Sequence, residues 1–473
     1  MIVELRVRPS RRQGGRSLQM FDPVDMATMT RGRWLGPCPT TPPVCFGHDT
    51  RESLEGGVYV AIRGESHDGH DYLEAARSAG AVMAIVDRAV DASIPCLLVE
   101  DVLAAIATLA GHWREQLAGT RVIAITGTAG KTTTKDLLHH VLGSILTGSA
   151  SPASWNNHIG GPMSLLRARP GDDYVILEMG TSSPGEIASL ARCARPDVGI
   201  ITLVGRGHLE GLQSVEGVRK EKYSLLDHLS SEGMAIVHDD GHEVDVRNDV
   251  TVLRHGDRPS SDPRLMARDA DGLHLSDGSR FVFHVPGRHQ AINALAVIAT
   301  ARIAGLGDDR ISEALSSSLP SAGRGTELLR SGVRFVDDAY NANPDSVAAS
   351  LAAFPEVPSD GRRIVILGDM LELGEEATDL HADLKGAIQA SHDRRSIDHL
   401  FLVGQAMSSL ANQVRDHGPC PVTAWERLDD AAIDHIVSGF HPGDLVLIKG
   451  SRGMRLERII RKTGDLESEA ATA

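Results

Sequence analysis

Short β-branched apolar runs alternate with amphipathic helical stretches along most of the chain, a pattern typical of α/β proteins with parallel sheets. In a first unit, residues 20 to about 118, strands are predicted at 58–62 and 82–86, with a helix over 72–79. In a second, 119 to about 318, strands are predicted at 122–125, 175–180 and 198–204, with helices over 215–229 and 294–303. In a third, 319–473, strands are predicted at 333–336, 363–367, 399–403 and 445–448. The predicted fold class is therefore α/β with three domains, the central one of mainly parallel sheet and the last Rossmann-like.

Composition narrows the class of protein. The chain has 473 residues and a net charge of −15. A negative charge of this size argues against a general surface for binding nucleic acid or acidic membranes. No apolar run approaches 18 residues, so we expect no membrane insertion. The five cysteines are scattered and form no C-x-x-C pair, which fits a reducing cytoplasm. We expect a cytoplasmic monomer.

The two ends of the chain lack apolar periodicity. Residues 1–19 hold five arginines and one acid. They read either as a basic tail for a partner or as a disordered leader that precedes a true start at Met20, and we favour the leader. Residues 467–473 are also predicted to be disordered.

A small-residue loop separates the strand at 122–125 from an amphipathic helix. Its sequence is Gly127-Thr128-Ala129-Gly130-Lys131-Thr132-Thr133. Strand, glycine loop and helix form a cradle whose backbone N–H groups face an anion, while Lys131 adds a positive charge and Thr132 a hydroxyl for Mg²⁺. The alternative is an ordinary tight turn between strand and helix. We predict ATP binding here.

Three further residues of the second unit have candidate chemistry. Glu178 lies near the end of one buried strand and His208 follows another, and open α/β sheets place ligands at the carboxyl ends of their strands. Together with a phosphate loop, they indicate metal binding. Lys222 lies on the apolar face of the 215–229 helix, where a bare ammonium would lose several kcal/mol of solvation. It either extends its head to water or is modified or paired in a site, and the pattern does not decide between these.

Two polar clusters lie at the ends of predicted strands in the first unit. They are Asp49-Thr50-Arg51 and the segment 64–70. Taken alone, each is as consistent with turn chemistry as with a binding site.

From about residue 21 to 457 the chain resembles the Mur ligases. The glycine loop is common to that superfamily and to folylpolyglutamate synthases, whereas longer motifs are more specific. These are NNHIG (156–160), EMG (178–180), HLEG (208–211), DAYNANP (338–344), GDMLELG (368–374) and KGSR (449–452). YNANPDS, GDMLELG and KGSR together resemble the branch that adds D-alanyl-D-alanine to UDP-N-acetylmuramoyl-tripeptide, and the DNPR motif of the branch that adds diaminopimelate or lysine is absent.

The resemblance implies a role for each matching position. Lys131 and the loop residues Gly127, Thr128, Ala129, Gly130, Thr132 and Thr133 would hold the phosphates of ATP. Two Mg²⁺ ions are implied, one bound by Thr132 and Glu178, the other by His208 and a carbamylated Lys222. Asn293 would contact adenine, Arg324 a phosphate and Asp338 the ribose. Lys131, His208, Lys222 and Arg324 form the implied catalytic set.

Substrate contacts are implied in all three units. Asp49, Thr50 and Arg51 of the first unit would bind the UDP-sugar, and Asn156 and Asn157 of the second would also contact substrate. Tyr340, Asn341 and Asn343 would lie near the incoming dipeptide. Leu203 departs from the family pattern, because asparagine usually stands five residues before the metal histidine. The loss of that polar side chain raises the question of which residue holds His208 in place.

The implied activity is ATP-dependent amide ligation through an acyl phosphate. It would join D-alanyl-D-alanine to UDP-N-acetylmuramoyl-tripeptide in peptidoglycan precursor synthesis, giving the pentapeptide, ADP and phosphate. The alternatives are a sibling ligase with another amine, a catalytically weak relative that binds nucleotide-sugars, and an ATPase coupled to motion.

Overall fold

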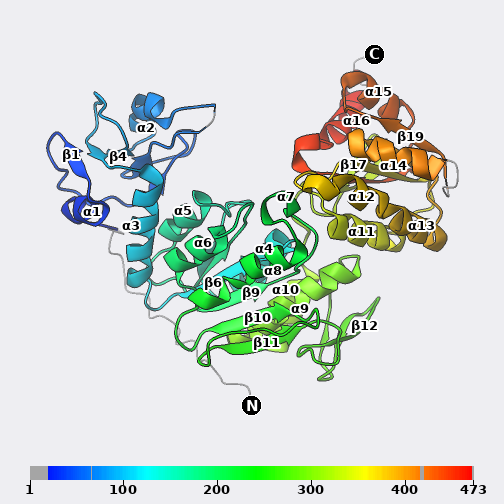
Figure 1. Cartoon of the computed structure of the whole chain (residues 1–473), viewed down its shortest axis with the longest axis horizontal. Coiled ribbons are helices and arrows are strands. Elements are labelled where there is room, and N and C mark those ends of the chain that lie inside the picture. Colours follow the sequence, from blue (N-terminus) through cyan, green and yellow to red (C-terminus); the bar gives the residue numbers. More distant parts are fainter. Residues whose placement is uncertain (1–19, 65, 416–419, 471–473) are drawn as a thin grey trace.

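The computed structural model describes residues 20–64, 66–415 and 420–470, and the predicted leader at 1–19 lies outside these ranges. Three large sheets follow one another along the chain, one in each unit, and the first and third units flank the middle one (Figure 1). The α/β prediction is confirmed. The domain boundaries near 118 and 318 remain predictions, because the helix before residue 118 packs on both the first and the middle units.

The first sheet has the order β1-β5-β4-β3-β2, and only β1 runs antiparallel to its neighbour. Its strands are β1 (Arg33–Leu35), β2 (Phe46–Gly47), β3 (Val58–Val60), β4 (Met83–Val86) and β5 (Cys96–Leu98). Its helices are α1 (Pro23–Thr30), α2 (Leu73–Ser78) and α3 (Val102–Gln116). The buried Trp113 of α3 donates a hydrogen bond to the carbonyl of Ala168 at 2.9 Å, so α3 ties the first unit to the middle one.

The middle sheet is entirely parallel, in the order β11-β10-β9-β6-β8-β7. Its strands are β6 (Arg121–Thr126), β7 (Gly148–Ala150), β8 (Tyr174–Glu178), β9 (Val198–Ile201), β10 (Met234–His238) and β11 (Thr251–His255). Its helices are α4 (Lys131–Gly143), α5 (Gly160–Arg167), α6 (Glu186–Ala194), α7 (Leu209–Leu212), α8 (Val215–Tyr223), α9 (Arg288–Ile303) and α10 (Asp308–Ser316). A small antiparallel sheet joins β12 (Leu265–Asp269), β13 (Gly272–Leu275) and β14 (Arg280–Phe281). Because parallel strands end at one edge, the loops after β6, β8, β9 and β10 share a rim.

The third sheet has the order β15-β16-β20-β17-β18-β19, with only β15 antiparallel to its neighbour. Its strands are β15 (Thr326–Arg330), β16 (Val333–Asp338), β17 (Arg363–Gly368), β18 (His399–Val403), β19 (Val422–Trp425) and β20 (Leu445–Lys449). Its helices are α11 (Pro344–Ala353), α12 (Ala377–Ala382), α13 (Leu384–Arg394), α14 (Gln405–Arg415), α15 (Asp430–Ser438) and α16 (Glu457–Ala470). The prediction of disorder from residue 467 is wrong as far as 470, because α16 continues that far.

The helix predicted over 215–229 is also shorter than expected. It ends at Tyr223, and a 3₁₀ turn, Leu226–His228, follows. The hydroxyl of Ser224 donates to the carbonyl of Glu221 at 2.6 Å, a local bond of the kind that competes with the helical ladder. Similarly, β9 ends at Ile201 rather than at 204, because the carbonyl of Leu203 accepts from the backbone N–H of Thr128 in the glycine loop.

Candidate active site

The glycine loop lies between the end of β6 and the start of α4. Gly127 has φ +153° and Gly130 has φ +85°, and a Cβ on Gly130 would come within 2.5 Å of Asn293 Oδ1. Only glycine allows both this backbone and this close approach. Lys131 is the first residue of α4, and its Nζ donates to the carbonyl of Gly127 at 2.8 Å. Burial lowers the pKa of Lys131, with nearby Glu178 opposing that shift.

A buried network surrounds Glu178 at the end of β8. One carboxylate oxygen accepts from Thr132 Oγ1 and the other from Asn156 Nδ2, each at 2.8 Å. Lys135 Nζ lies 3.8 Å from the carboxylate and donates to the carbonyl of Ser151 at 2.9 Å. Thr132 and Glu178 therefore place a hydroxyl and a carboxylate side by side, and such oxygen donors suit Mg²⁺.

A cavity of about 670 Å³ lies between the glycine loop and the third unit. Most of the predicted site residues line it: Thr128, Ala129, Gly130, Lys131, Thr132, Thr133, Asn156, Asn157, Glu178, His208, Asn293, Arg324, Asp338, Tyr340, Asn341 and Asn343. The structure thus brings together in one cavity residues that lie more than 200 positions apart. Gly127 lies in the loop behind Lys131. Lys222, Asp49, Thr50 and Arg51 are not among the residues that line the cavity.

His208 enters the cavity from the turn before α7. Its backbone is left-handed, with φ +57°, and its Nδ1 lies 2.7 Å from a carboxylate oxygen of Glu372 in the third unit. The His208 contact lowers the pKa of the Glu372 carboxyl.

Lys222 of α8 does not extend to water. Its side chain is 0% exposed, and among the described residues its ammonium nitrogen has no hydrogen-bond partner. Burial, with a contribution from Lys131, drives its pKa well below the usual lysine value. A lysine held neutral is the form that can react with carbon dioxide, and a carbamate would add oxygen donors where an ammonium would repel a metal. The residues present therefore fit a modified Lys222.

The metal ligands implied by the resemblance do not form a conventional protein cage. Among residues 20–64, 66–415 and 420–470, no group of three or more His, Cys, Asp or Glu side chains is placed to hold a metal ion. The implied set instead uses one or two protein groups per ion, an arrangement common for Mg²⁺ bound together with nucleotide phosphates.

One end of the cavity combines groups from the middle and third units, among them the residues predicted to contact the nucleotide. Asn293 lies against Gly130, as described above, while Asp338 at the end of β16 accepts from Lys449 Nζ at 2.7 Å. The guanidinium of Arg324 lies 4.2 Å from the centre of the Tyr340 ring. Lys449 is the last residue of β20, and no role in the site was predicted for it from the sequence. Its place at the end of a buried strand is the same feature that pointed to Glu178.

Three predicted substrate residues have structural duties as well. Asn157 Oδ1 accepts from the backbone N–H of Gly160 at 2.9 Å, and Asn341 Oδ1 from that of Ala342 at 2.9 Å. Asn343 caps α11 and its Nδ2 also donates to the Thr128 carbonyl at 3.4 Å. These asparagines hold the shape of the cavity wall.

Asp49 and Arg51 pair with each other in the first unit. Arg51 Nη2 lies 2.6 Å from Asp49 Oδ2, and the bonds from Arg51 lower the Asp49 pKa to about 2. The Arg51 side chain is 89% exposed. The neighbouring His48 ring lies 5.0 Å from that of Trp155, which directly precedes Asn156, so this loop packs beside one end of the cavity wall.

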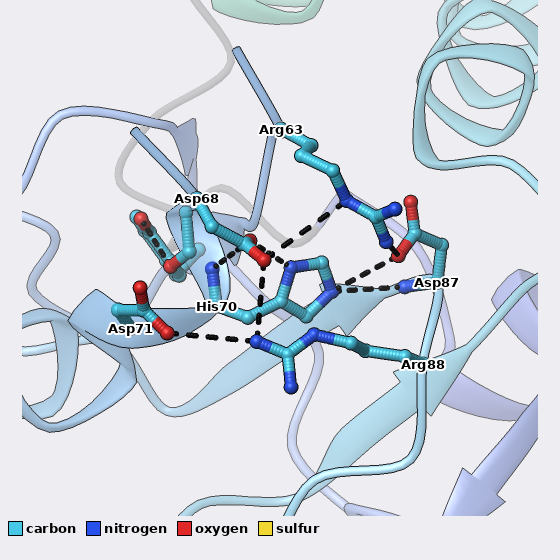
Figure 2. Close-up of polar contacts among 8 residues, drawn as sticks. Arg63, Asp68, His70, Asp71, Asp87 and Arg88 are labelled. Atoms are coloured by element: carbon cyan, nitrogen blue, oxygen red, sulfur yellow. Dashed lines mark hydrogen bonds and ion pairs between the residues drawn. The ribbon is translucent and has the colours of Figure 1, made fainter. Parts of the chain in front are cut away.

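The second polar cluster of the first unit closes the ends of β3 and β4 (Figure 2). The His70 ring is fully buried; its Nδ1 lies 2.6 Å from Asp68, and its Nε2 accepts from the backbone N–H of Asp87 at 3.2 Å. Arg63 pairs with Asp87 at 2.6 Å and Arg88 with Asp68 at 3.2 Å. This interlocked set matches the turn interpretation of residues 64–70.

Leu203 supports the glycine loop through its backbone. Its carbonyl accepts from Thr128, and its neighbour Thr202 donates from Oγ1 to the carbonyl of Ala129 at 2.6 Å. These contacts require no polar side chain at position 203. The support of His208 comes instead from Glu372, a residue that the motif placed in a strand-end loop without assigning it a role.

Comparison with protein-family models places this fold and site in a known class. Residues 125–301 match the Mur ligase middle domain, and residues 323–452 match the Mur ligase glutamate ligase domain. The class is therefore that of ligases of the Mur type.

Individual relatives refine that assignment. UDP-N-acetylmuramoyl-tripeptide–D-alanyl-D-alanine ligase of Bacillus subtilis is 32% identical over 423 residues, which are 87% of this chain and 91% of the relative. The crystal structure of MurF from Acinetobacter baumannii superposes with a TM-score of 0.80 at 26% identity, covering 95% of this chain and all of that one. MurF ligase from Thermotoga maritima in complex with ADP gives 0.73 at 26% identity, with 90% and 98% covered. The chain belongs to the Mur ligase family, in its UDP-N-acetylmuramoyl-tripeptide–D-alanyl-D-alanine ligase branch.

Proposed function

We propose that this protein joins D-alanyl-D-alanine to UDP-N-acetylmuramoyl-tripeptide at the expense of ATP, as a MurF-type ligase of peptidoglycan precursor synthesis. The observation that carries the proposal is the single cavity lined by the glycine loop, by Glu178 and His208, and by the third unit. The relatives named above favour this reaction over that of a sibling ligase with another amine.

The first step is activation of the peptide carboxylate. A carboxylate oxygen attacks the γ-phosphorus of ATP, the bond to the bridging oxygen breaks, and ADP leaves with that electron pair. Lys131 and the backbone N–H groups of the loop would hold the phosphates, and Arg324 would offset charge from the third-unit side. Asn293 and Asp338 would fix adenine and ribose, so that the γ-phosphate meets the carboxylate in a constant position.

We propose two Mg²⁺ ions, because the negatively charged peptide carboxylate must approach the negatively charged triphosphate. Thr132 with Glu178 would hold one ion, and His208 with carbamylated Lys222 the other. Mg²⁺ supplies neutralisation of phosphate and carboxylate charge there. The Thr132 hydroxyl beside Glu178 and the unpartnered, buried Lys222 nitrogen support this assignment.

The second step forms the amide. The dipeptide amine attacks the acyl carbon, phosphate leaves, and the amine gives up a proton. Tyr340, Asn341 and Asn343 come from the third unit, whose docking on the glycine loop would position the amine and exclude the water that hydrolyses an acyl phosphate. The UDP-sugar would lie on the first unit near Asp49, Thr50 and Arg51, with Asn156 and Asn157 next to its peptide.

The setting follows from the same features. We place the enzyme in the cytoplasm as a monomer, since its five cysteines are all free and one chain supplies every group named above. Within the described ranges, no helix is both long and apolar enough to cross a membrane.

Phosphate release tests the proposal. With ATP and Mg²⁺, release should require both UDP-N-acetylmuramoyl-tripeptide and D-alanyl-D-alanine, and the product should be heavier than the tripeptide substrate by the dipeptide less one water. Phosphate release that requires the nucleotide-sugar but does not depend on the dipeptide would be consistent with the activation step. It would refute D-alanyl-D-alanine as the amine.

A further inference from the structure

Glu372 contacts the middle unit although it belongs to the third. It lies in the loop between β17 and the 3₁₀ turn Gly374–Glu376, and its carboxylate meets His208 Nδ1 at 2.7 Å across the shared cavity. Its carbonyl also accepts from the backbone N–H of Glu210 at 3.2 Å. The two segments therefore meet through both a side chain and the main chain.

Both partners have unusual backbones. His208 has φ +57° and Glu372 has φ +62°, and each is a residue with a Cβ in the left-handed region. Such conformations are unfavourable for residues with a Cβ and persist only where the surroundings hold them. The surroundings here are apolar, because Leu209 and Leu212 of α7 share a buried cluster with Met370 and Leu373 of the Glu372 loop.

The ion pair itself contributes little to folding. The Glu372 side chain is 58% exposed, and ion pairs exposed to solvent contribute little to stability. A carboxylate held in place by an unusual backbone conformation and apolar packing, in an ion pair too exposed to add much to stability, points to a role in the site.

Histidines that bind metals commonly donate the second ring N–H to a carboxylate, which fixes the ring and its tautomer. With Nδ1 bonded to Glu372, Nε2 is the ring nitrogen of His208 that remains available to bind a metal. The groups of Glu372 and His208 thus have the arrangement that a metal-binding histidine requires.

We propose that Glu372 is a positioning residue that orients His208 for the second Mg²⁺, so that docking of the third unit completes a metal site of the middle unit. This inference rests on the proposed function, which assigns that ion to His208. It explains in addition how the enzyme would delay acyl activation until the unit that carries the amine-binding residues is in place.

Metal binding without turnover tests the inference. Mn²⁺ replaces Mg²⁺, a non-hydrolysable ATP analogue replaces ATP, and electron paramagnetic resonance counts free Mn²⁺ during a titration. Glu372→Ala should weaken the second Mn²⁺ by about tenfold or more and leave the first unchanged. Glu372→Gln should weaken it less, because the amide oxygen still accepts from Nδ1–H. Glu375→Gln, an exposed acid three residues further along, is the matched control and should bind like wild type.

A double variant separates orientation from independent effects. Once His208→Ala removes the ligand, Glu372→Ala should cause no further loss of Mn²⁺, since it acts through His208. Equal binding by wild type and Glu372→Ala, or losses that multiply in the double variant, would overturn the inference. In a separate steady-state assay of Glu372→Ala, a change confined to the KM for the dipeptide would likewise overturn it, because Glu372 would then contact the amine. The titration contains neither peptide nor dipeptide, so a wrong amine assignment leaves its result unaffected.

Discussion

The two walls of the cavity are built differently. On the middle-unit wall, Glu178 is 1% exposed and bonded on both oxygens; Lys222 of the same unit, which does not line the cavity, is completely buried. On the third-unit wall, the side chains of Glu372 and Arg452 are more than half exposed. The first wall is set by the fold of one sheet, whereas the second depends on how the third unit docks. The middle-unit wall is thus preformed, and the third-unit wall is assembled onto it.

Lys222→Ala gives the largest expected effect, because it removes a proposed metal ligand that the middle unit holds in place by itself. We expect ligation to fall by about 10³-fold. Formate or acetate should restore part of it by supplying the missing carboxylate. Lys220→Ala, on the exposed face of the same helix, is the control and should keep full activity. Wild-type rates in Lys222→Ala would refute the carbamate role.

Asp338→Ala tests the assembled wall and should have a smaller effect. We expect the KM for ATP to rise about tenfold, as for loss of one good hydrogen bond, with kcat little changed. Because the variant also removes the partner of Lys449, Asp338→Asn and thermal unfolding of both proteins control for folding. An unchanged KM in a folded Asp338→Ala protein would argue against ribose binding.

His255→Leu should have the smallest effect on ligation, and it tests how a buried histidine at the end of β11 makes stability depend on pH. His255 ends β11, and burial lowers its pKa to about 3. The unfolded chain protonates this histidine near pH 6.5 and the folded chain does not, so its contribution to stability is complete above pH 6.5 and is lost as pH falls towards 3. Between pH 6 and 4.5, wild type should lose up to about 1.4 kcal/mol per pH unit more than the variant.

Urea unfolding at several pH values measures that difference. Leucine at the exposed His242 serves as the control, and it should keep the wild-type pH dependence. Parallel curves for wild type and His255→Leu would show that the buried rim does not contribute in this way.

Local pattern was enough to predict the preformed wall. The strand predicted at 122–125 lies within β6 and is one residue short at each end, and the glycine loop is identified by residues adjacent in sequence. Helix ends were less predictable, since α8 stops where the Ser224 hydroxyl competes for a helical carbonyl. Such a bond depends on a side-chain rotamer that apolar periodicity does not report.

The assembled wall required the structure. His208 and Glu372 are 164 residues apart, and their contact depends on the docking of two sheets that share no strand. Lys135 was missed for a different reason. A lysine on an amphipathic helix is expected to face water, whereas here its side chain is buried beside Glu178.

Isotope transfer tests the central claim, acyl-phosphate ligation, most directly. The terminal carboxylate of UDP-N-acetylmuramoyl-tripeptide is labelled with ¹⁸O, and the enzyme turns over ATP in the presence of D-alanyl-D-alanine. Because the attacking carboxylate oxygen stays on phosphorus when the amine displaces phosphate, the released phosphate should contain one ¹⁸O atom from the labelled carboxylate. Amide product formed together with unlabelled phosphate would contradict the account.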